Sequence, residues 1–513
     1  MASGRPQHPP ESTRHPVGIR RGLLSFGTLA GAFGLLTATA IPAGATTGDL
    51  EHLVQVDNVY EHLENLQTIA DFNDDNRAHG TDGYDISAMY VVDQLEQAGY
   101  EPEEHHFEFE SWQEHSDPVL AQTAPEEEEF ELGEDYLSMT YAAAGDVTAA
   151  GVPVNAESMD SACSADDFTD FPEGAIAIAQ RGECDFAQKT QNAADAGAEA
   201  IVIFNHGEDE DGTGPVAGTL GEEGDIPAIG ASDEVGDQLA SVGDDLELTV
   251  MVDASVQVDT SYNIFAETEG GADDNVVMVG GHLDSVPEGP GINDNASGVG
   301  AVLETAIQQA RLDDPNNTIR FAFWGAEELG LHGSNEYVAG LSEQELDDLA
   351  LYLNFDMIGS PNFGRFIYDG KGEIEDSEPS PTGSAAIHQL WEDYFDEQEL
   401  PAEASPMHAR SDHFGFLQAG IPIGGLNSGV DAIKTEEQVE MYGGVAGEPF
   451  DPNYHTAADD LDNINQEVLG DLSNGIAHSV ETYGESTLPV NGVVQLRQEM
   501  ELEPDRIGEL WVR

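Results

Sequence analysis

Short apolar runs of strand length alternate with a longer amphipathic stretch in the second half of this chain. The apolar runs cover residues 276–279, 318–323 and 351–355, and glycine-rich or polar segments bound them. Runs of this length are typical of buried strands. Between the first two runs, residues 299–310 repeat apolar side chains at three- and four-residue spacing, which predicts a helix. Strands that alternate with helices predict an α/β fold, with a mostly parallel central sheet under helices on both faces.

The first part of the chain, residues 49–130, shows helical patterns. We expect a helix over residues 84–100 that buries one apolar face, formed by Ile86, Met89, Val92 and Leu95. Ala98-Gly99 at its end is typical of a helix C-cap. This helix has no residues that suggest chemistry, so we interpret it as structural.

Residues 131–255 differ from both neighbouring regions. Short β patterns at 175–179 and 200–204 lie on either side of an alanine-rich helical pattern at 188–196. Loops rich in Asp, Glu and Gly separate these elements. We therefore expect a β-rich insertion here.

These patterns divide the chain into a few predicted parts, as its length of 513 residues requires. In chain order they are an export signal at 1–45, a main domain at 46–130 and 256–485 that the insertion at 131–255 interrupts, and a carboxy-terminal extension at 486–513. Within the extension, Val493, Val494 and Leu496 are compatible with a strand.

Charge is the most unusual feature of the composition. The chain has 101 acidic residues against 16 basic ones, a formal net charge of −85. Such a surface repels phosphate, which excludes nucleic acid as a partner. Disorder is the other common cause of high net charge, but 39% hydrophobic residues favour folded domains. A folded protein this acidic resembles those of extreme halophiles, in which molar salt screens the repulsion.

The amino terminus has the pattern of an export signal. Arg20-Arg21 precedes an apolar stretch at 22–42, and Ala43-Gly44-Ala45 is similar to a cleavage site. A membrane anchor is the alternative, because a stretch of this length is just long enough to span a bilayer. The paired arginines favour a cleaved twin-arginine signal. We therefore expect a soluble, extracellular protein without a stable membrane anchor, and we expect a monomer.

The two cysteines, Cys163 and Cys184, both lie in the predicted insertion. Exported chains meet an oxidising environment, so a single disulfide is expected. Two separate buried thiols are the alternative. Neither cysteine has partners at the spacing of a zinc site.

Residues that could take part in catalysis or metal binding follow each apolar run. His282 and Asp284 come directly after the first run, the pair Glu327-Glu328 closely follows the second, and Asp356 follows the third. In open α/β sheets, ligands bind at the carboxyl ends of the strands.

Two further positions complete the candidate site. Asp294 lies in a glycine- and asparagine-rich loop after the first run, and His455 precedes the last helical region. With His282, Glu328 and Asp356 they provide two imidazoles and three carboxylates. This donor set suits two zinc ions, and Asp294 can bridge them.

Four segments carry a resemblance to a known family. They are His-Leu-Asp-Ser-Val with Gly-Ile-Asn-Asp-Asn, Trp-Gly-Ala-Glu-Glu-Leu-Gly-Leu-His-Gly-Ser, Leu-Asn-Phe-Asp-Met-Ile-Gly-Ser and Tyr-His-Thr-Ala-Ala-Asp. In this order they resemble the secreted co-catalytic di-zinc aminopeptidases of bacterial type. The run from Gly174 to Ala198 resembles the protease-associated domain that is inserted in many secreted peptidases, which implies a lid or a purely structural role.

The resemblance implies a role for each metal ligand. It implies that His282, Asp294 and Asp356 hold one zinc ion. It likewise implies that Asp294, Glu328 and His455 hold the other. The family pattern also implies a cis peptide bond after Asp294.

Further site residues follow from the same resemblance. Glu327 matches the general base, and Tyr454 matches the phenol that donates to the tetrahedral oxyanion. Asp284 is expected to accept the second N–H of the His282 imidazole. Arg410 matches an arginine near the substrate terminus, with an ion pair to Asp412 as the alternative.

The pocket wall is less clearly marked in the sequence. We expect Met357 and the segment 424–426 to line the substrate pocket.

The expected activity is zinc-dependent removal of amino-terminal residues from peptides. Two alternatives remain on the same scaffold: a carboxypeptidase or glutaminyl-cyclase-like activity, and a non-catalytic receptor-like binding protein. The complete ligand set favours an enzyme over the binding protein.

Overall fold

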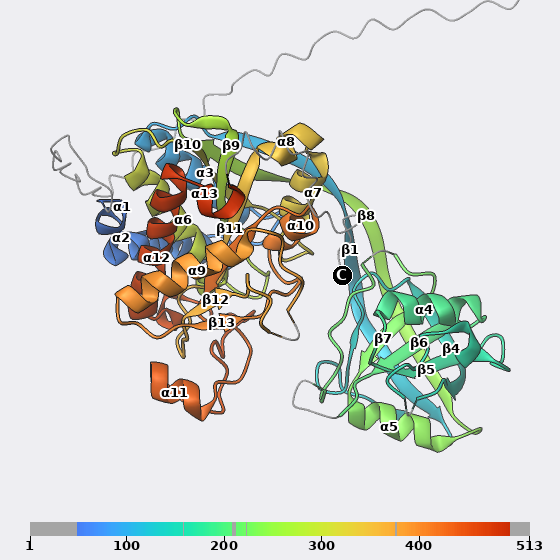
Figure 1. Cartoon of the computed structure of the whole chain (residues 1–513). Coiled ribbons are helices and arrows are strands. Elements are labelled where there is room, and N and C mark those ends of the chain that lie inside the picture. Colours follow the sequence, from blue (N-terminus) through green and yellow to red (C-terminus); the bar gives the residue numbers. More distant parts are fainter. Residues whose placement is uncertain (1–48, 157, 208–211, 222, 375–376, 493–513) are drawn as a thin grey trace, which may run out of the picture. The chain divides into compact units, whose positions relative to one another are not determined.

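A computed structural model describes residues 49–156, 158–207, 212–221, 223–374 and 377–492 of the chain (Figure 1). The predicted export signal at 1–45 and the apolar residues Val493, Val494 and Leu496 lie outside the described residues.

The centre of the main domain is a parallel sheet, as the alternating pattern predicts. The strands β14 (Ile423–Asn427), β11 (Leu349–Phe355), β9 (Ala272–His282) and β10 (Asn317–Trp324) are neighbours in this order and run parallel. Antiparallel strands border them on both sides: β8 (Glu247–Glu267) beside β10, and β12 (Phe366–Tyr368), with β13 (Glu403–Ser405), beside β14. The carboxyl ends of β9, β10 and β11 therefore meet at one edge, where the candidate ligands follow.

Successive residues of each strand point to opposite faces of the sheet, and helices cover both faces. Val277 and Val279 of β9 belong to the larger core, whose helices are α1 (Asp49–Leu53), α2 (Val56–Asp71), α3 (Asp82–Ala98), α6 (Gly298–Gln309), α9 (Ser384–Glu397), α12 (Gln466–Glu485) and α13 (Leu488–Asn491). Val276 and Met278 belong to the core on the other face, whose helices are α7 (His332–Gly340), α8 (Glu343–Asp348) and α10 (His413–Gln418). The predicted α/β architecture is confirmed.

Helix α3 forms where the sequence predicts it, and Gly99 caps it with a φ of 109°. The predicted apolar face is wrong in part: Leu95 is buried and Val92 packs against the core, but Ile86 and Met89 are 41% and 65% exposed. Three-residue steps drift around a helix that turns ~100° per residue, so positions nine apart point in opposite directions. The buried face instead uses mixed spacing, through Tyr84, Ala88, Val91 and Leu95.

Two long strands connect the main sheet to the region of the predicted insertion at 131–255. Strand β1 (Glu103–Ala124) pairs antiparallel with β8 along nearly its whole length, and β4 (Gly145–Pro153) pairs with the first part of β8. The parallel strands β5 (Ile176–Gln180), β6 (Ala200–Phe204) and β7 (Ala228–Ala231) follow, with β3 (Tyr136–Ser138) at the edge and the helices α4 (Phe186–Asp195) and α5 (Asp233–Val242) packed on them. These elements share their own hydrophobic core.

A disulfide closes a loop of the insertion. The Sγ atoms of Cys163 and Cys184 lie 2.02 Å apart, so the structure joins the two cysteines. The remaining short elements are β2 (Glu128–Glu129), η1 (Ala165–Phe168), η2 (Ile292–Ser297), α11 (Glu436–Tyr442) and η3 (Leu461–Asn463). In the part of the chain that the structure describes, no helix combines the length and apolar character needed to cross a bilayer.

Candidate metal centre

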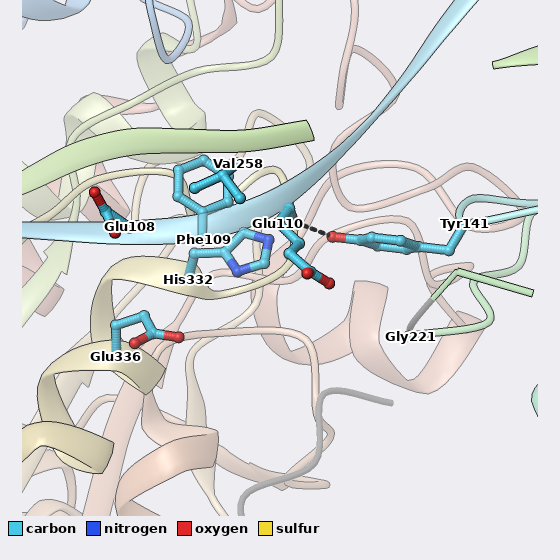
Figure 2. Close-up of a pocket in the computed structure, with 8 residues that line it drawn as sticks. All are labelled: Glu108, Phe109, Glu110, Tyr141, Gly221, Val258, His332 and Glu336. Carbon is cyan, nitrogen blue, oxygen red and sulfur yellow. Dashed lines mark hydrogen bonds between the residues drawn. The ribbon is translucent and has the colours of Figure 1, made fainter. Parts of the chain in front are cut away.

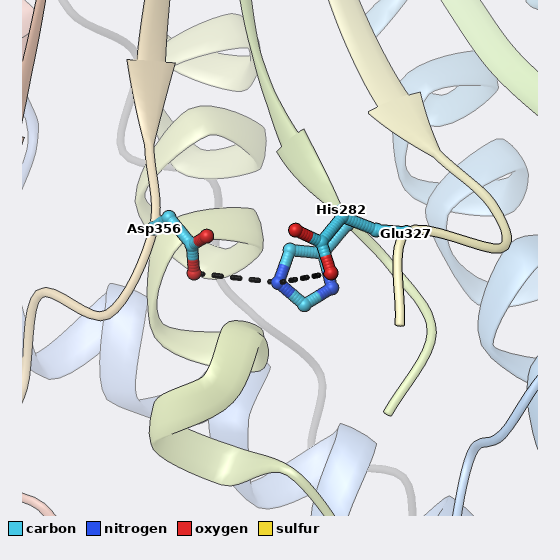
Figure 3. Close-up of side chains that lie close together, drawn as sticks. All are labelled: His282, Glu327 and Asp356. Carbon is cyan, nitrogen blue, oxygen red and sulfur yellow. Dashed lines mark hydrogen bonds and ion pairs between the residues drawn. The ribbon is translucent and has the colours of Figure 1, made fainter. Parts of the chain in front are cut away.

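The candidate ligands converge from distant parts of the sequence. His282 is the last residue of β9, and Asp356 follows β11 directly. Glu327 and Glu328 lie in the turn after β10, and Asp294 lies in η2. Figure 3 shows His282, Glu327 and Asp356 with their polar atoms directed toward one another.

The first group of polar atoms surrounds the imidazole of His282. Its Nε2 lies 3.1 Å from Oδ1 of Asp294 and 3.3 Å from Oδ1 of Asp356. Oε2 of Glu327 is farther away, at 4.0 Å. The His282 side chain is only 1% exposed, so this group lies below the protein surface.

The second group surrounds the imidazole of His455. Its Nε2 lies 3.2 Å from Oδ2 of Asp294 and 3.1 Å from Oε2 of Glu328. Asp294 thus directs one carboxylate oxygen to each imidazole. All five predicted ligands come together, in the two groups that the resemblance implies.

The spacing of these atoms fits a tetrahedral metal. Ligand atoms at ~2.05 Å from a tetrahedral zinc ion are about 3.3 Å from one another. The distances from His282 to Asp294 and Asp356 are 3.1 and 3.3 Å. In addition, Oε1 of Glu328 is buried without a hydrogen-bond partner. Nitrogen and carboxylate donors in this arrangement fit zinc at both groups.

Both imidazoles lie in a strongly negative environment. Burial alone would lower the pKa of His282, but the carboxylates of Glu327 and Asp356 outweigh it and raise the pKa well above its ordinary value. Burial also acts downward on His455, yet its hydrogen-bonded carboxylates raise the pKa to about 10. These carboxylates require positive charge nearby, which either protonated imidazoles or metal cations supply.

The carboxylates differ in how readily they ionise. Burial lifts the pKa of Glu327 well above its ordinary value. Burial, reinforced by the charge of Asp294, raises the pKa of Glu328 to about 7. Burial also acts upward on Asp294 itself, but hydrogen bonds to both imidazoles bring its pKa below its ordinary value. A buried glutamate with a raised pKa is suited to accept and return a proton.

Asp284 has a different role from the predicted one. Nδ1 of His282 lies 3.1 Å from the backbone oxygen of Asp284 but 3.9 Å from its carboxylate Oδ1, too far for a hydrogen bond. The carboxylate instead accepts the backbone N–H groups of Glu327 and Glu328, at 3.2 and 3.3 Å. Asp284 therefore holds the turn that carries both glutamates, and a backbone carbonyl orients the imidazole.

Tyr454 and Arg410 lie beside the second group. The Tyr454 ring stacks on His455, with 3.8 Å between ring centroids. The Arg410 guanidinium lies 6.0 Å from the Tyr454 ring centroid. Arg410 forms an ion pair with Asp431 at 3.0 Å, so the alternative partner Asp412 is wrong. Asp412 is fully buried, which takes it out of reach of an exposed guanidinium.

The predicted pocket wall is wrong in part. Gly424 and Gly425 lie inside β14, where an added Cβ would come within 2.4 Å of Ile387 and 2.5 Å of the Asn354 carbonyl oxygen. They are core positions, because a parallel central strand is covered on both faces. Met357 follows Asp356 with a φ of 57° and is 2% exposed, so the structure buries it next to the predicted ligand.

Several supporting residues have no counterpart in the sequence-based prediction. Asp459 accepts the backbone N–H groups of Asn293 and Asp294, at 2.8 and 3.0 Å. Ser411 donates to Oδ2 of Asp356 at 2.6 Å. Asp459 ends the Tyr-His-Thr-Ala-Ala-Asp segment, so its proximity to His455 in sequence was an available signal.

A surface pocket is lined by residues other than the predicted ligands (Figure 2). Its volume is about 410 Å³, and its lining includes Glu108, Glu110 and Glu336. The His332 ring stacks on Phe109 there, with 4.3 Å between centroids. None of the candidate ligands lines this pocket, so the chemistry is assigned to the ligand cluster rather than to this cavity.

Two protein-family models match separate parts of the chain. A model described as peptidase family M28 matches residues 263–480, and one described as PA domain matches residues 145–239. An aminopeptidase of Pseudomonas aeruginosa is 45% identical over 435 residues, which cover 83% of this chain and 81% of that protein.

Two further similar proteins are informative. The probable lipoprotein aminopeptidase LpqL of Mycobacterium tuberculosis is 42% identical over 455 residues, with 86% of this chain and 88% of that protein covered. The solved aminopeptidase from Aneurinibacillus sp. strain AM-1 superimposes with a TM-score of 0.68 at 29% identity, covering 85% of this chain and 95% of that one. The chain therefore belongs to peptidase family M28, in which the relatives named above are aminopeptidases, and it carries an inserted PA domain.

Proposed function

We propose that this chain is a zinc-dependent aminopeptidase that holds two metal ions and cleaves the amino-terminal bond of peptides. The observation that carries the proposal is the position of Asp294 between two imidazoles. Its Oδ1 lies 3.1 Å from Nε2 of His282, and its Oδ2 lies 3.2 Å from Nε2 of His455. A carboxylate with one oxygen in each group suits a bridge between two cations.

Each ion has its own residues in this proposal. His282, Asp294 and Asp356 hold one ion. Asp294, Glu328 and His455 hold the other. When bound, a pair of zinc ions supplies Lewis acidity for peptide hydrolysis at neutral pH.

Glu327 is the proposed general base. Its carboxylate is 8% exposed and lies near His282 without being among the closest ligand atoms. It takes a proton from the attacking water and returns it to the leaving amine. Asp284 keeps it in place, because the Asp284 carboxylate binds the backbone N–H of Glu327.

Tyr454 is the proposed hydrogen-bond donor to the oxyanion. Burial and the charge of Asp294 raise the pKa of Tyr454, so the phenol keeps its proton and can donate it in a hydrogen bond. Arg410 lies beside this ring and is held by Asp431, and we propose that it contacts the substrate near its terminus.

We also propose that the enzyme acts outside the cell, as a monomer, in high salt. The support for export is the pattern at 1–45. The support for salt adaptation is the net charge of −85 and the scarcity of exposed lysine. Of the three lysines, Lys189 and Lys434 are buried and Lys371 pairs with Glu392.

Hydrolysis of leucine-p-nitroanilide by the purified chain in molar salt tests the proposal. We expect turnover that a chelator abolishes and zinc restores. A blocked amino terminus on the same substrate should prevent cleavage. Turnover of carboxy-terminal substrates alone, or cyclisation of amino-terminal glutamine, would contradict the aminopeptidase assignment.

A further inference from the structure

Arg77 is a buried cation with an unusual set of partners. Its side chain is completely buried, in the segment between α2 and α3. Nε donates to the carbonyl of Pro290 at 2.9 Å, Nη2 donates to that of Gly291 at 2.6 Å, and Nη1 donates to that of Leu283. Within the described part of the chain, Arg77 forms no ion pair with a carboxylate.

This choice of partners is informative in so acidic a protein. The chain has 101 acidic residues, and Arg365, which is also deeply buried, does pair with Asp471 at 2.9 Å. A planar guanidinium provides several donors in a fixed fork, so it can hold a set of carbonyls in one geometry. Arg77 therefore serves backbone positions rather than a single opposite charge.

All three carbonyls belong to one loop, residues 283–293, which we call the ligand loop because it joins His282 to Asp294. The backbone N–H of Arg77 donates to Oγ of Ser285 in the same loop at 2.9 Å. The neighbouring Asn76 donates to the carbonyl of Pro287 at 3.3 Å. The segment at Arg77 thus contacts the ligand loop at both ends and in the middle.

The ligand loop is shaped to receive the guanidinium. Gly291 has a φ of 61°, and a Cβ there would lie 3.1 Å from Nη2 of Arg77 and 2.5 Å from the Ser285 side chain. A larger residue at this position would push the guanidinium and the loop apart. The close approach therefore needs glycine.

Arg77 also places positive charge behind the candidate ligands. The carboxylates of Asp284, Asp459, Asp294 and Glu328 act on it, in this order of strength. Burial lowers the pKa of Arg77 to about 10, which leaves it charged at neutral pH.

We propose that Arg77 is a positioning residue for the metal centre: its guanidinium fixes the ligand loop so that His282 and Asp294 face one another. This inference rests on the proposed zinc site. It predicts that metal affinity depends on Arg77, although its side chain forms no hydrogen bond with His282 or Asp294.

Zinc affinity, measured by competition with a chromogenic chelator, tests the role of Arg77. We expect Arg77→Met to weaken zinc binding by about 10- to 100-fold, the range found for residues that orient metal ligands. Arg77→Lys keeps the charge but not the fork, so we expect a smaller loss. Ser285→Ala, which removes one contact of the ligand loop, provides a milder variant that should fold even if Arg77→Met does not.

Arg365→Met is the matched control, because it also removes a buried arginine but one that pairs with Asp471. We expect it to lower the unfolding temperature of the metal-free protein while zinc affinity stays unchanged. Equal losses of affinity in Arg77→Met and Arg365→Met, or wild-type affinity in all variants at Arg77 and Ser285, would overturn the inference. Failure of the wild-type protein to bind zinc would instead reject the proposed function.

Discussion

Asp459 accepts the backbone N–H of Asp294 through Oδ2, at 3.0 Å. Its Oδ1 accepts the N–H of Asn293 at 2.8 Å and a side-chain N–H of Asn463 at 3.0 Å. The side chain of Asn463 also donates to Asp451, and Asn293 donates to the same carboxylate at 2.6 Å. A buried polar network therefore holds the bridging aspartate from its backbone side, while its carboxylate remains directed at both imidazoles.

Replacement of Asp459 by asparagine tests this support. An asparagine side chain cannot accept at both positions, so the backbone N–H of either Asn293 or Asp294 loses its acceptor. We expect zinc affinity to fall by about 10- to 100-fold, measured by chelator competition. Asp462→Asn is the control, because Asp462 is exposed and should leave the affinity unchanged. An unchanged affinity in Asp459→Asn would show that the network does not position the ligand.

Glu327→Gln should separate catalysis from metal binding. The amide cannot accept the proton of the attacking water, so we expect kcat to fall by ~10²- to 10⁴-fold. Zinc content should stay at the wild-type level, because Glu327 is the most distant of the three carboxylates around His282, at 4.0 Å. Glu336→Gln, on the exposed side of α7, serves as the control. Loss of zinc in Glu327→Gln would instead identify Glu327 as a ligand.

Tyr454→Phe should affect the transition state more than substrate binding. Removal of one oxyanion donor typically costs ~10²- to 10³-fold in kcat. We expect a loss of this size with a nearly unchanged KM, measured on leucine-p-nitroanilide. Tyr442→Phe removes a phenol that lies near Glu403, outside the site, and should keep wild-type kinetics. A large rise in KM alone would indicate that Tyr454 binds substrate in the ground state.

The acidic surface predicts a strong dependence of stability on salt. Repulsion among the carboxylates extends over a Debye length of about 10 Å at 0.1 M salt and only about 3 Å at 1 M. We expect the unfolding temperature to rise steadily with KCl over this range, and potassium and sodium chloride should act alike. An unfolding temperature that falls or stays constant would contradict salt adaptation.

Much of the candidate site could be predicted because parallel strands bring distant residues to one edge. His282 ends a buried strand, Glu327 and Asp356 follow such strands, and the strands β9, β10 and β11 are neighbours in the sheet. The positions of these three residues at the ends of such strands therefore indicated that they lie close together in space. The strands themselves could be predicted because continuous apolar segments are typical of a sheet that is buried on both faces.

Other features depend on tertiary contacts that no local pattern encodes. Arg77 lies far from the ligands in sequence, in a segment without a periodic pattern, and only the fold brings it to the ligand loop. Gly424 was expected at the pocket wall, but it packs against Ile387 inside β14, a contact that only the fold reveals. The carboxylate of Asp284 accepts backbone N–H groups from the turn after β10, which the two-residue spacing from His282 could not indicate.

Metal stoichiometry tests the central claim most directly, because everything proposed here requires that Asp294 bridges two cations. Metal-free protein should be titrated with zinc in molar salt while bound metal and peptidase activity are followed together. We predict that two equivalents bind per chain and that Asp294→Ala weakens the binding of both. Full activity with a single equivalent, or unimpaired binding of two equivalents by Asp294→Ala, would contradict this account.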